Sequence, residues 1–179
     1  MKLFQGFDIL AANAPFVEPQ DIPVDVRHLH ITRSQLVLTD KPTFAFTRGR
    51  QRVQDVFEML RIRHGLGLDE FVEQPVVWAN INTNSPRQLD IPMALGIIDM
   101  ARAGQVCVMT PFTLAGAMAP VSLAGALLLQ HAEALAAITL AQLTRAGAPV
   151  VYGGFTSNVD LRSGSPAFGT PEALAERAQ

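Results

Sequence analysis

Short apolar runs alternate with longer stretches of amphipathic spacing along almost the whole chain. The short runs are rich in β-branched or aromatic residues and lie next to turn-forming residues, which is typical of buried strands. The pattern predicts five strands, at residues 7–12, 43–47, 75–81, 105–109 and 149–152. Because helical stretches separate these runs, we expect a parallel sheet with right-handed crossovers.

The longer stretches place apolar residues three and four positions apart, as on one face of a helix. They predict helices at residues 24–38, 50–64, 92–103 and 120–145, and a last helix that starts at Thr170-Pro171-Glu172. Asp90 supplies an N-cap, and Gly104 and Gly147 follow the last residues of two helices. The sequence therefore predicts a single α/β domain over residues 1–179.

The loops that follow the predicted strands are longer and more polar than the turns that lead into strands. They comprise residues 82–90, 110–119 and 153–170. This asymmetry is typical of α/β proteins whose functional site lies at the carboxyl edge of the sheet. No strand is followed by a GxGxxG or P-loop pattern, which argues against a Rossmann nucleotide site.

About five parallel βα units in series favour a partial TIM (β/α) barrel as the fold class. A complete eight-stranded barrel takes about 250 residues, and this chain has 179. We therefore expect an incomplete (β/α)8 barrel. It is either a piece of a longer protein or a protomer that covers its apolar edges with a partner.

The composition indicates a globular protein, with 49% hydrophobic and 17% charged residues. The net charge of −2 gives no electrostatic reason to expect nucleic acid or an anionic membrane as a partner. Polar residues interrupt the apolar region 114–143, which favours a buried helix over a membrane span. The first residues lack the apolar core of a signal peptide, so we expect a cytoplasmic protein.

Cys107 is the one cysteine of the chain and cannot form an internal disulfide, which fits a reducing compartment. Its neighbours Val106 and Val108 predict an inert buried thiol rather than a nucleophile. His28 and His30 show no metal-ligand spacing with Cys107. We expect no metal to be bound directly by this chain.

Three segments resemble the trimethylamine methyltransferase family. They lie at residues 80–86 (NINTNSP), 110–125 (TPFTLAGAMAPVSLAG) and 147–160 (GAPVVYGGFTSNVD). Residues 17–21 (VEPQD) and 27–30 (RHLH) are similar to the upstream region of that family, less specifically. The resemblance spans nearly the whole chain.

The resemblance implies a TIM-barrel enzyme of about 500 residues, twice the size of a minimal barrel. Such enzymes move a methyl group from a tertiary or quaternary amine to the cobalt of a corrinoid (cobalamin) carried by a separate small protein. No corrinoid is then bound directly by this chain, and the partners are a corrinoid protein and a small amine. Some members contain pyrrolysine, but this chain ends before that position, so trimethylamine and glycine-betaine types of donor both stay open.

An amine pocket of this type needs aromatic faces, because they attract quaternary ammonium groups by about 0.5–2 kcal/mol each. Phe112 and Phe155 are the first candidates, at or near the carboxyl ends of predicted strands. Tyr152 and Trp78 are further candidates. For each of them, filling of the barrel core is an alternative, and it is the stronger one for Tyr152 and Trp78.

Polar candidates lie beside these aromatic residues. Asn80 and Asn82 share one strand face and would bind a substrate carboxylate, or equally hydrogen-bond the loop backbone. Thr110 is a candidate lining group or a turn residue. Asp160 would balance the substrate charge, or form a surface ion pair with Arg162.

Gly153 and Gly154 open a loop poor in side chains, which would let a corrinoid approach the barrel mouth, or would simply be a flexible loop. His131 and Glu133 of the long helix are expected to be helix-face residues rather than catalysts. The catalytic residues are not identified by the sequence.

Two functions from different classes remain. The first is a methyltransferase that is complete only in a longer form, in which case we expect the isolated chain to be inactive. The second is a truncated, non-catalytic paralogue that binds amines or assembles with another chain, including a second copy in a homo-oligomer. The lack of paired catalytic carboxylates and of a phosphate-binding glycine pattern counts against a sugar- or phosphate-processing barrel.

Overall fold

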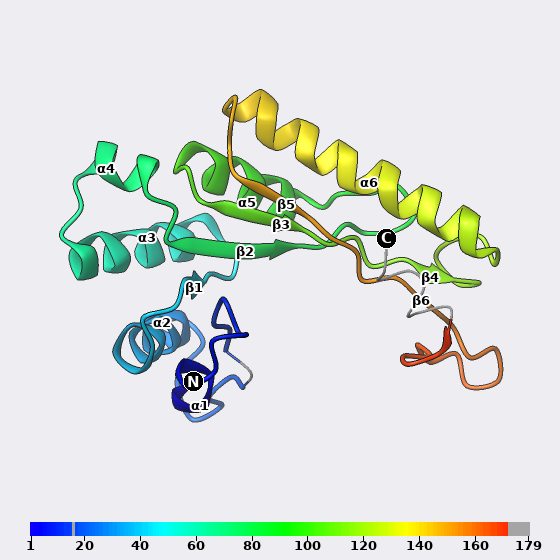
Figure 1. Ribbon diagram of the computed structural model, residues 1–179, viewed down its shortest axis with the longest axis horizontal. Helices are drawn as coiled ribbons and strands as arrows, with labels where there is room; N and C mark the ends of the chain where they lie inside the picture. Colours follow the sequence, from blue (N-terminus) through cyan, green and yellow to red (C-terminus); the bar gives the residue numbers. More distant parts are fainter. Residues whose placement is uncertain (16, 172–179) are drawn as a thin grey trace.

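The protein, a computed structural model, is described for residues 1–15 and 17–171. Its central sheet has four strands: β1 (Thr43–Phe44), β2 (Val77–Ile81), β3 (Val106–Met109) and β5 (Val150–Tyr152). Each neighbouring pair is parallel, and the strand order β1-β2-β3-β5 follows the chain (Figure 1). The predicted parallel α/β sheet is confirmed, and the strands that the structure describes do not close into a barrel.

The helices connect the strands in the predicted alternation. They are α1 (Lys2–Gln5), α2 (Arg27–Leu38), α3 (Arg50–His64), α4 (Leu68–Glu73), α5 (Ile91–Arg102) and α6 (Leu123–Thr144). The predicted helix at 50–64 matches α3, and Asp90 caps α5 by accepting a hydrogen bond from the backbone N–H of Met93 at 2.8 Å. The short helix α4 was missed. The predicted last helix after Thr170 lies outside the described residues.

The hydrophobic core lies on one face of the sheet. Ala79 of β2 and Cys107 and Met109 of β3 are fully buried there against apolar residues of α3, α5 and α6. On the opposite face Asn80 is exposed and its neighbour in register, Val108, is only half-buried. All three helices therefore cover the same side of the sheet, as expected for a singly wound parallel sheet.

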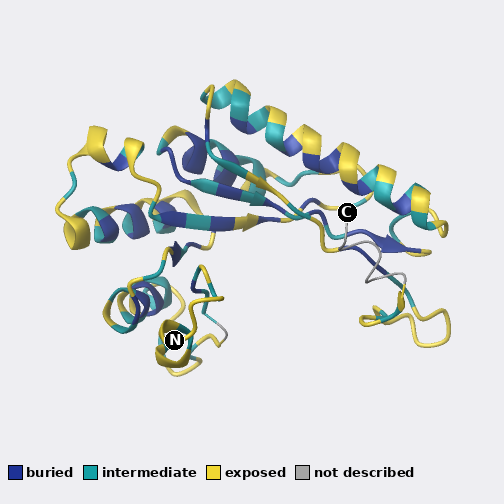
Figure 2. Cartoon of the chain, viewed as in Figure 1, coloured by how far each residue is buried: buried dark blue, intermediate teal, exposed yellow. Residues whose placement is uncertain are grey.

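Helix α6 lies above the sheet and extends past its carboxyl edge toward β4 (Leu114–Ala115) (Figure 1). By length and composition it is apolar enough to cross a membrane. Figure 2 shows it buried toward the sheet and exposed on its outer side. Ala137 and Ala141 on the inner side belong to the core. The absence of a membrane partner stays a prediction.

The predicted first strand at residues 7–12 is wrong. The ammonium group of Lys41 is hydrogen-bonded to the carbonyl oxygens of Phe4, Phe7 and Leu10, at 2.7, 2.6 and 2.5 Å. Three carbonyls of one segment converge on a single cation only if the chain is coiled, whereas an extended strand points alternate carbonyls in opposite directions. Phe7 and Ile9 of this segment are exposed, and Leu10 is only half-buried. The sheet thus has four strands rather than the five predicted.

Candidate functional site

Two chain segments continue side by side beyond the carboxyl ends of β3 and β5. Backbone N–H groups of the second segment donate to carbonyls of the first in four successive bonds: Gly153 to Met109, Phe155 to Pro111, Ser157 to Thr113 and Val159 to Ala115. The last two form the short parallel pair of β4 (Leu114–Ala115) and β6 (Ser157–Asn158). The parallel register of the sheet is therefore carried out into the loops.

This register places Phe112 opposite Phe155, and Thr113 opposite Thr156. Their side chains point alternately to the two sides of the extended segments. The phenylalanine rings stack with centroids 5.3 Å apart and planes inclined by 30°. Phe168 extends the row, with its ring 5.5 Å from that of Phe155. The two aromatic residues that the sequence put first are therefore brought together.

An open cavity of about 440 Å³ lies against this aromatic pair. Its lining residues come from the loop after β2 and from the two extended segments: Asn82, Thr83, Asn84, Ser85, Phe112, Met118 and Phe155. None of these lining residues carries a formal charge. The cavity thus has one aromatic wall and one wall of amide and hydroxyl groups. We call it the aromatic pocket.

Two predicted polar residues meet at the base of the loops. The hydroxyl of Thr110 donates to the amide oxygen of Asn82 at 2.8 Å. Asn80 lies two residues before Asn82, on the open face of the sheet, and is not among the residues that line the pocket.

Tyr152 lies apart from the pocket. It pairs in register with the buried Met109, so its side chain faces the helix-covered side of the sheet. Its hydroxyl is 3.2 Å from Nδ1 of His131 on α6, and the two rings meet edge to face. The described geometry offers no contact between Tyr152 and an occupant of the aromatic pocket.

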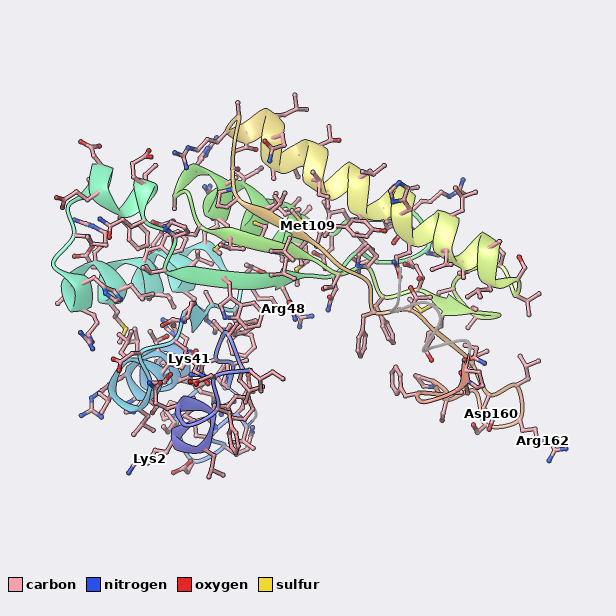
Figure 3. All side chains as sticks on the ribbon, viewed as in Figure 1. Lys2, Lys41, Arg48, Met109, Asp160 and Arg162 are labelled. Carbon is pink, nitrogen blue, oxygen red and sulfur yellow. The ribbon has the colours of Figure 1, made fainter. Side chains whose placement is uncertain are left out.

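Asp160 forms a turn at the tip of a projecting loop. Its carboxylate accepts hydrogen bonds from the backbone N–H of Arg162 at 2.9 Å and from the hydroxyl of Ser163 at 3.0 Å. These bonds hold the pKa of Asp160 below its usual value. Figure 3 shows Asp160 and Arg162 at the end of the loop, far from Met109 in the sheet. The expected side-chain ion pair of these two residues does not form.

Gly153 and Gly154 are explained by packing inside the protein. A Cβ at Gly154 would lie 2.3 Å from the amide nitrogen of Gln130, and one at Gly153 would lie 3.1 Å from a methyl group of Thr110. Both glycines thus allow the second segment to pass close to α6 and to β3. That they also admit a corrinoid stays a prediction.

The side of the extended segments that faces away from the pocket packs on α6. There the hydroxyls of Thr113 and Thr156 contact one another, and that of Thr156 donates to Oε1 of Gln130. All three side chains are buried. One turn farther along α6, Glu133 is 5% exposed and accepts hydrogen bonds from the hydroxyls of Thr83 and Ser85 and from the N–H of Arg87.

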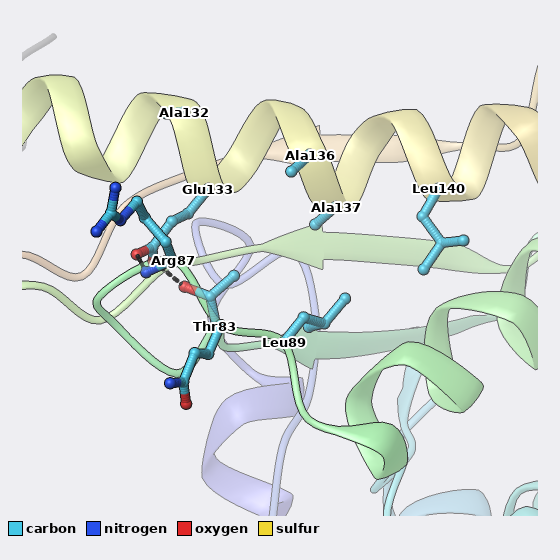
Figure 4. A pocket seen from close by; sticks show the side chains of 9 residues that line it. Thr83, Arg87, Leu89, Ala132, Glu133, Ala136, Ala137 and Leu140 are labelled. Atoms are coloured by element: carbon cyan, nitrogen blue, oxygen red, sulfur yellow. Dashed lines mark hydrogen bonds between the residues drawn. The ribbon is translucent and has the colours of Figure 1, made fainter.

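The expectation that Glu133 is an ordinary helix-face residue is therefore wrong, whereas His131 is exposed as expected. Figure 4 shows the Glu133 side chain reaching from α6 toward Thr83 and Arg87. It ends beside a second cavity of about 290 Å³, which is mostly apolar and is lined by α6 and the loop after β2. One sequence signal accompanies this arrangement: the dipeptide Phe-Thr, present also at 46–47, occurs at 112–113 and at 155–156.

The candidate metal and nucleophile groups lie elsewhere. Burial raises the pKa of the Cys107 thiol to about 12, so the predicted inert thiol is supported by its surroundings. His28 is 2.8 Å from a carboxylate oxygen of Asp55, an interaction between α2 and α3. Among the described residues, no group of three or more His, Cys, Asp or Glu side chains is placed to hold a metal ion.

The chain is 41% identical over 155 residues to a glycine betaine methyltransferase of Desulfitobacterium hafniense strain Y51, covering 87% of this chain and 32% of that protein. It is 35% identical over 156 residues to the trimethylamine methyltransferase MttB of D. hafniense strain DCB-2, covering 87% of this chain and 31% of that protein. The trimethylamine methyltransferase MttB of Methanosarcina thermophila is 31% identical over 157 residues, or 84% of this chain and 32% of its own length.

The chain thus spans about a third of the length of these curated relatives. The sequence model of the family described as Trimethylamine methyltransferase (MTTB) matches residues 1–178, which includes the three segments that form the aromatic pocket. The chain belongs to the trimethylamine methyltransferase family.

Proposed function

We propose that this chain forms the amine-binding part of a methyltransferase that takes a methyl group from a quaternary ammonium compound. The observation that carries the proposal is the aromatic pocket, in which stacked Phe112 and Phe155 face a wall of amides and hydroxyls. Aromatic faces attract a quaternary ammonium group through the ring quadrupole. The polar wall offers the amides of Asn82 and Asn84 to the other end of a zwitterion such as glycine betaine, because the hydroxyls of Thr83 and Ser85 already donate to Glu133.

The uncharged lining favours a quaternary over a tertiary amine. When a nucleophile takes a methyl group from a quaternary nitrogen, the electron pair of the broken C–N bond stays on nitrogen and a neutral tertiary amine leaves. A tertiary alkylamine is already protonated in water near neutral pH, and its N–H then needs an acceptor in the pocket. None of the described residues that line the pocket is an Asp, Glu, His or Lys. The pocket can therefore bind and orient a quaternary amine, and its lining provides no carboxylate to accept from the N–H of a protonated tertiary one.

The methyl acceptor that we propose is the cobalt of a corrinoid carried by a partner protein, which would supply a strong nucleophile. A third cavity, of about 550 Å³, adjoins the pocket. It shares Met118 with the pocket, and its lining includes the small residues Ala117, Ala119 and Gly125. We assign the approach of the acceptor to this side. The glycines at 153 and 154 are engaged by α6 and Thr110 instead.

The singly wound sheet supports the proposal of a partial (β/α)8 barrel. Helices α3, α5 and α6 cover one face of the sheet, and the loops that form the pocket follow the carboxyl ends of the strands. In barrel enzymes the site lies at this end. We also propose, from the sequence alone, that the protein is cytoplasmic and that it binds neither nucleic acid nor a membrane.

Binding tests the first part of the proposal. Glycine betaine, trimethylamine and 3,3-dimethylbutanoate, which has a tert-butyl group in place of the trimethylammonium group of glycine betaine, would be titrated into the protein by NMR. We expect the ring protons of Phe112 and Phe155 to shift with glycine betaine, and more weakly with 3,3-dimethylbutanoate, which lacks the ammonium charge. A response to trimethylamine alone would overturn the preference for a quaternary amine.

Methyl transfer tests the second part. A polypeptide of the relatives' full length that carries this chain would be incubated with methyl-labelled glycine betaine and a reduced corrinoid protein. We expect dimethylglycine to form together with the absorbance change of corrinoid methylation. Binding without any label transfer would favour the non-catalytic, amine-binding alternative.

A further inference from the structure

Helix α6 contacts both walls of the aromatic pocket from behind, through two polar residues one turn apart. Gln130 reaches the segments that carry the phenylalanine rings, and Glu133 reaches the loop after β2. Neither residue is among those that line the pocket. We propose that Gln130 and Glu133 are positioning residues, and that they fix the distance and angle between the aromatic wall and the polar wall.

The aromatic wall depends on a buried chain of side-chain hydrogen bonds that ends at α6. Phe112 and Phe155 are each followed by a threonine whose hydroxyl points to the opposite side of the chain. The two threonine hydroxyls meet, and Thr156 is bonded to Gln130. Four backbone bonds set the register of the two segments, and this side-chain bond anchors them to α6, so that it holds the rings at their stacked position. The absent side chain of Gly154 leaves the space that the Gln130 amide occupies.

The polar wall depends on one carboxylate. Oε2 of Glu133 accepts from the hydroxyls of Thr83 and Ser85, the latter at 2.7 Å. Oε1 accepts from the backbone N–H of Arg87 at 2.6 Å, a residue with a positive φ of 58°. Three donors from one loop thus converge on a buried acceptor that donates nothing in return. The loop bonded in this way carries Asn82 and Asn84, whose amides face the pocket.

The two contacts predict different consequences for binding. This step rests on the proposed function, because it assigns the ammonium group to the rings and the carboxylate group to the loop. Loss of the Gln130 bond should weaken tetramethylammonium and glycine betaine alike. Loss of an acceptor at Glu133 should weaken glycine betaine and spare tetramethylammonium, which has no carboxylate to bind. A residue that only stabilises the fold would also affect both ligands equally, so for Gln130 the contact between the two rings is the deciding readout.

The test uses two variants and a control on the same helix. Gln130→Leu keeps the volume and removes the acceptor, and Glu133→Gln replaces one carboxylate oxygen with a donor that opposes the donors of the loop. Gln142→Leu is the control, because Gln142 bonds to Gly147 and Ala148 at the far end of α6. Thr156→Val, which keeps the shape of Thr156, replaces Gln130→Leu if that variant does not fold.

The first readout is the NOE between the ring protons of Phe112 and Phe155 in the ligand-free protein. We expect it to be lost in Gln130→Leu and kept in Gln142→Leu. The second readout is affinity. We expect Gln130→Leu to bind both ligands about tenfold more weakly, and Glu133→Gln to lose about tenfold for glycine betaine only.

Each result decides something different. Wild-type ring contact and affinities in both variants would overturn the inference. A lost ring contact in a protein that binds neither ligand, even as the wild type, would refute the proposed function and still support the role of Gln130 in positioning the rings.

Discussion

Phe112 and Phe155 stack at 5.3 Å because they are opposite one another in a parallel register that runs on past β3 and β5. The paired residues of β3 and β5 end at Met109 and Tyr152. The stacking is therefore set by the extended segments that follow, which keep the parallel backbone hydrogen bonds of the sheet. The same alternation directs Thr113 and Thr156 to α6. A pocket on one side of these segments and a polar anchor on the other are thus two consequences of a single register.

Replacing one ring tests the cation–π contribution of this pair. Phe155→Leu should lower the affinity for glycine betaine about three- to tenfold, which corresponds to the loss of one aromatic contact with an ammonium group. The affinity for 3,3-dimethylbutanoate should change much less, because leucine preserves most of the apolar contact. Isothermal titration with both ligands measures the difference.

Phe7→Leu is the matched control, since Phe7 is an exposed phenylalanine of the N-terminal segment. It should leave both affinities unchanged. If Phe155→Leu weakened the two ligands equally, the ring would be an apolar surface only, and the assignment of the ammonium group to it would be wrong.

Much of the fold could be predicted because the signals are local. The helix at 50–64 has an apolar face of Val53, Val56 and Leu60, and Gly65 ends it in the left-handed conformation. The strands of the sheet have β-branched or aromatic residues bounded by turns. Residues 7–12 were misread because their apolar content resembles a strand, whereas the distant Lys41 decides their conformation.

The candidate site was predicted only in part, for the same reason. Phe112, Phe155, Asn82 and Thr110 lie at strand ends, where the order of elements alone places them close together. Burial of a polar helix residue depends on partners far away in the sequence. Glu133 was therefore predicted to be a helix-face residue, whereas the loop after β2 covers its side chain and is hydrogen-bonded to it.

The surroundings of Cys107 predict a thiol that resists alkylation. Burial raises its pKa from the ordinary 9.0 to about 12, so much less of the thiol is ionised near pH 8. Iodoacetamide should modify the native protein much more slowly than the protein unfolded in urea, as followed by mass spectrometry. Comparable rates in the two states would mean that Cys107 is accessible.

The contact between α2 and α3 predicts a loss of stability in acid. His28 lies 2.8 Å from Asp55, and the amide of Gln51 donates to the same carboxylate at 2.9 Å. These hydrogen bonds lower the pKa of Asp55 below its ordinary value of 3.8. A carboxylate with a lower pKa in the folded state stabilises the fold above the unfolded pKa, and this contribution is lost as the pH falls through the folded one.

Asp55→Asn should therefore reduce the free energy of unfolding by about 0.5 kcal/mol near pH 6, a value scaled down for a partly exposed group. The difference from the wild type should shrink below about pH 4, where Asp55 becomes protonated. Urea denaturation across this range measures it. Asp21→Asn, at an exposed position before α2, is the control. A constant difference at every pH would assign the effect to packing instead of charge.

Two glycines that follow helices separate backbone strain from close packing. Gly104 after α5 and Gly147 after α6 have positive φ angles of 67° and 79°. A Cβ at Gly104 would lie 2.0 Å from the carbonyl oxygen of Val72, whereas one at Gly147 would meet no atom within 4 Å. Gly147→Ala should cost about 1 kcal/mol, the strain of an L-residue in this conformation. Gly104→Ala should cost about 3 kcal/mol or more, because the backbone of α4 must also move. Equal losses in urea denaturation would show that the contact with Val72 relaxes freely.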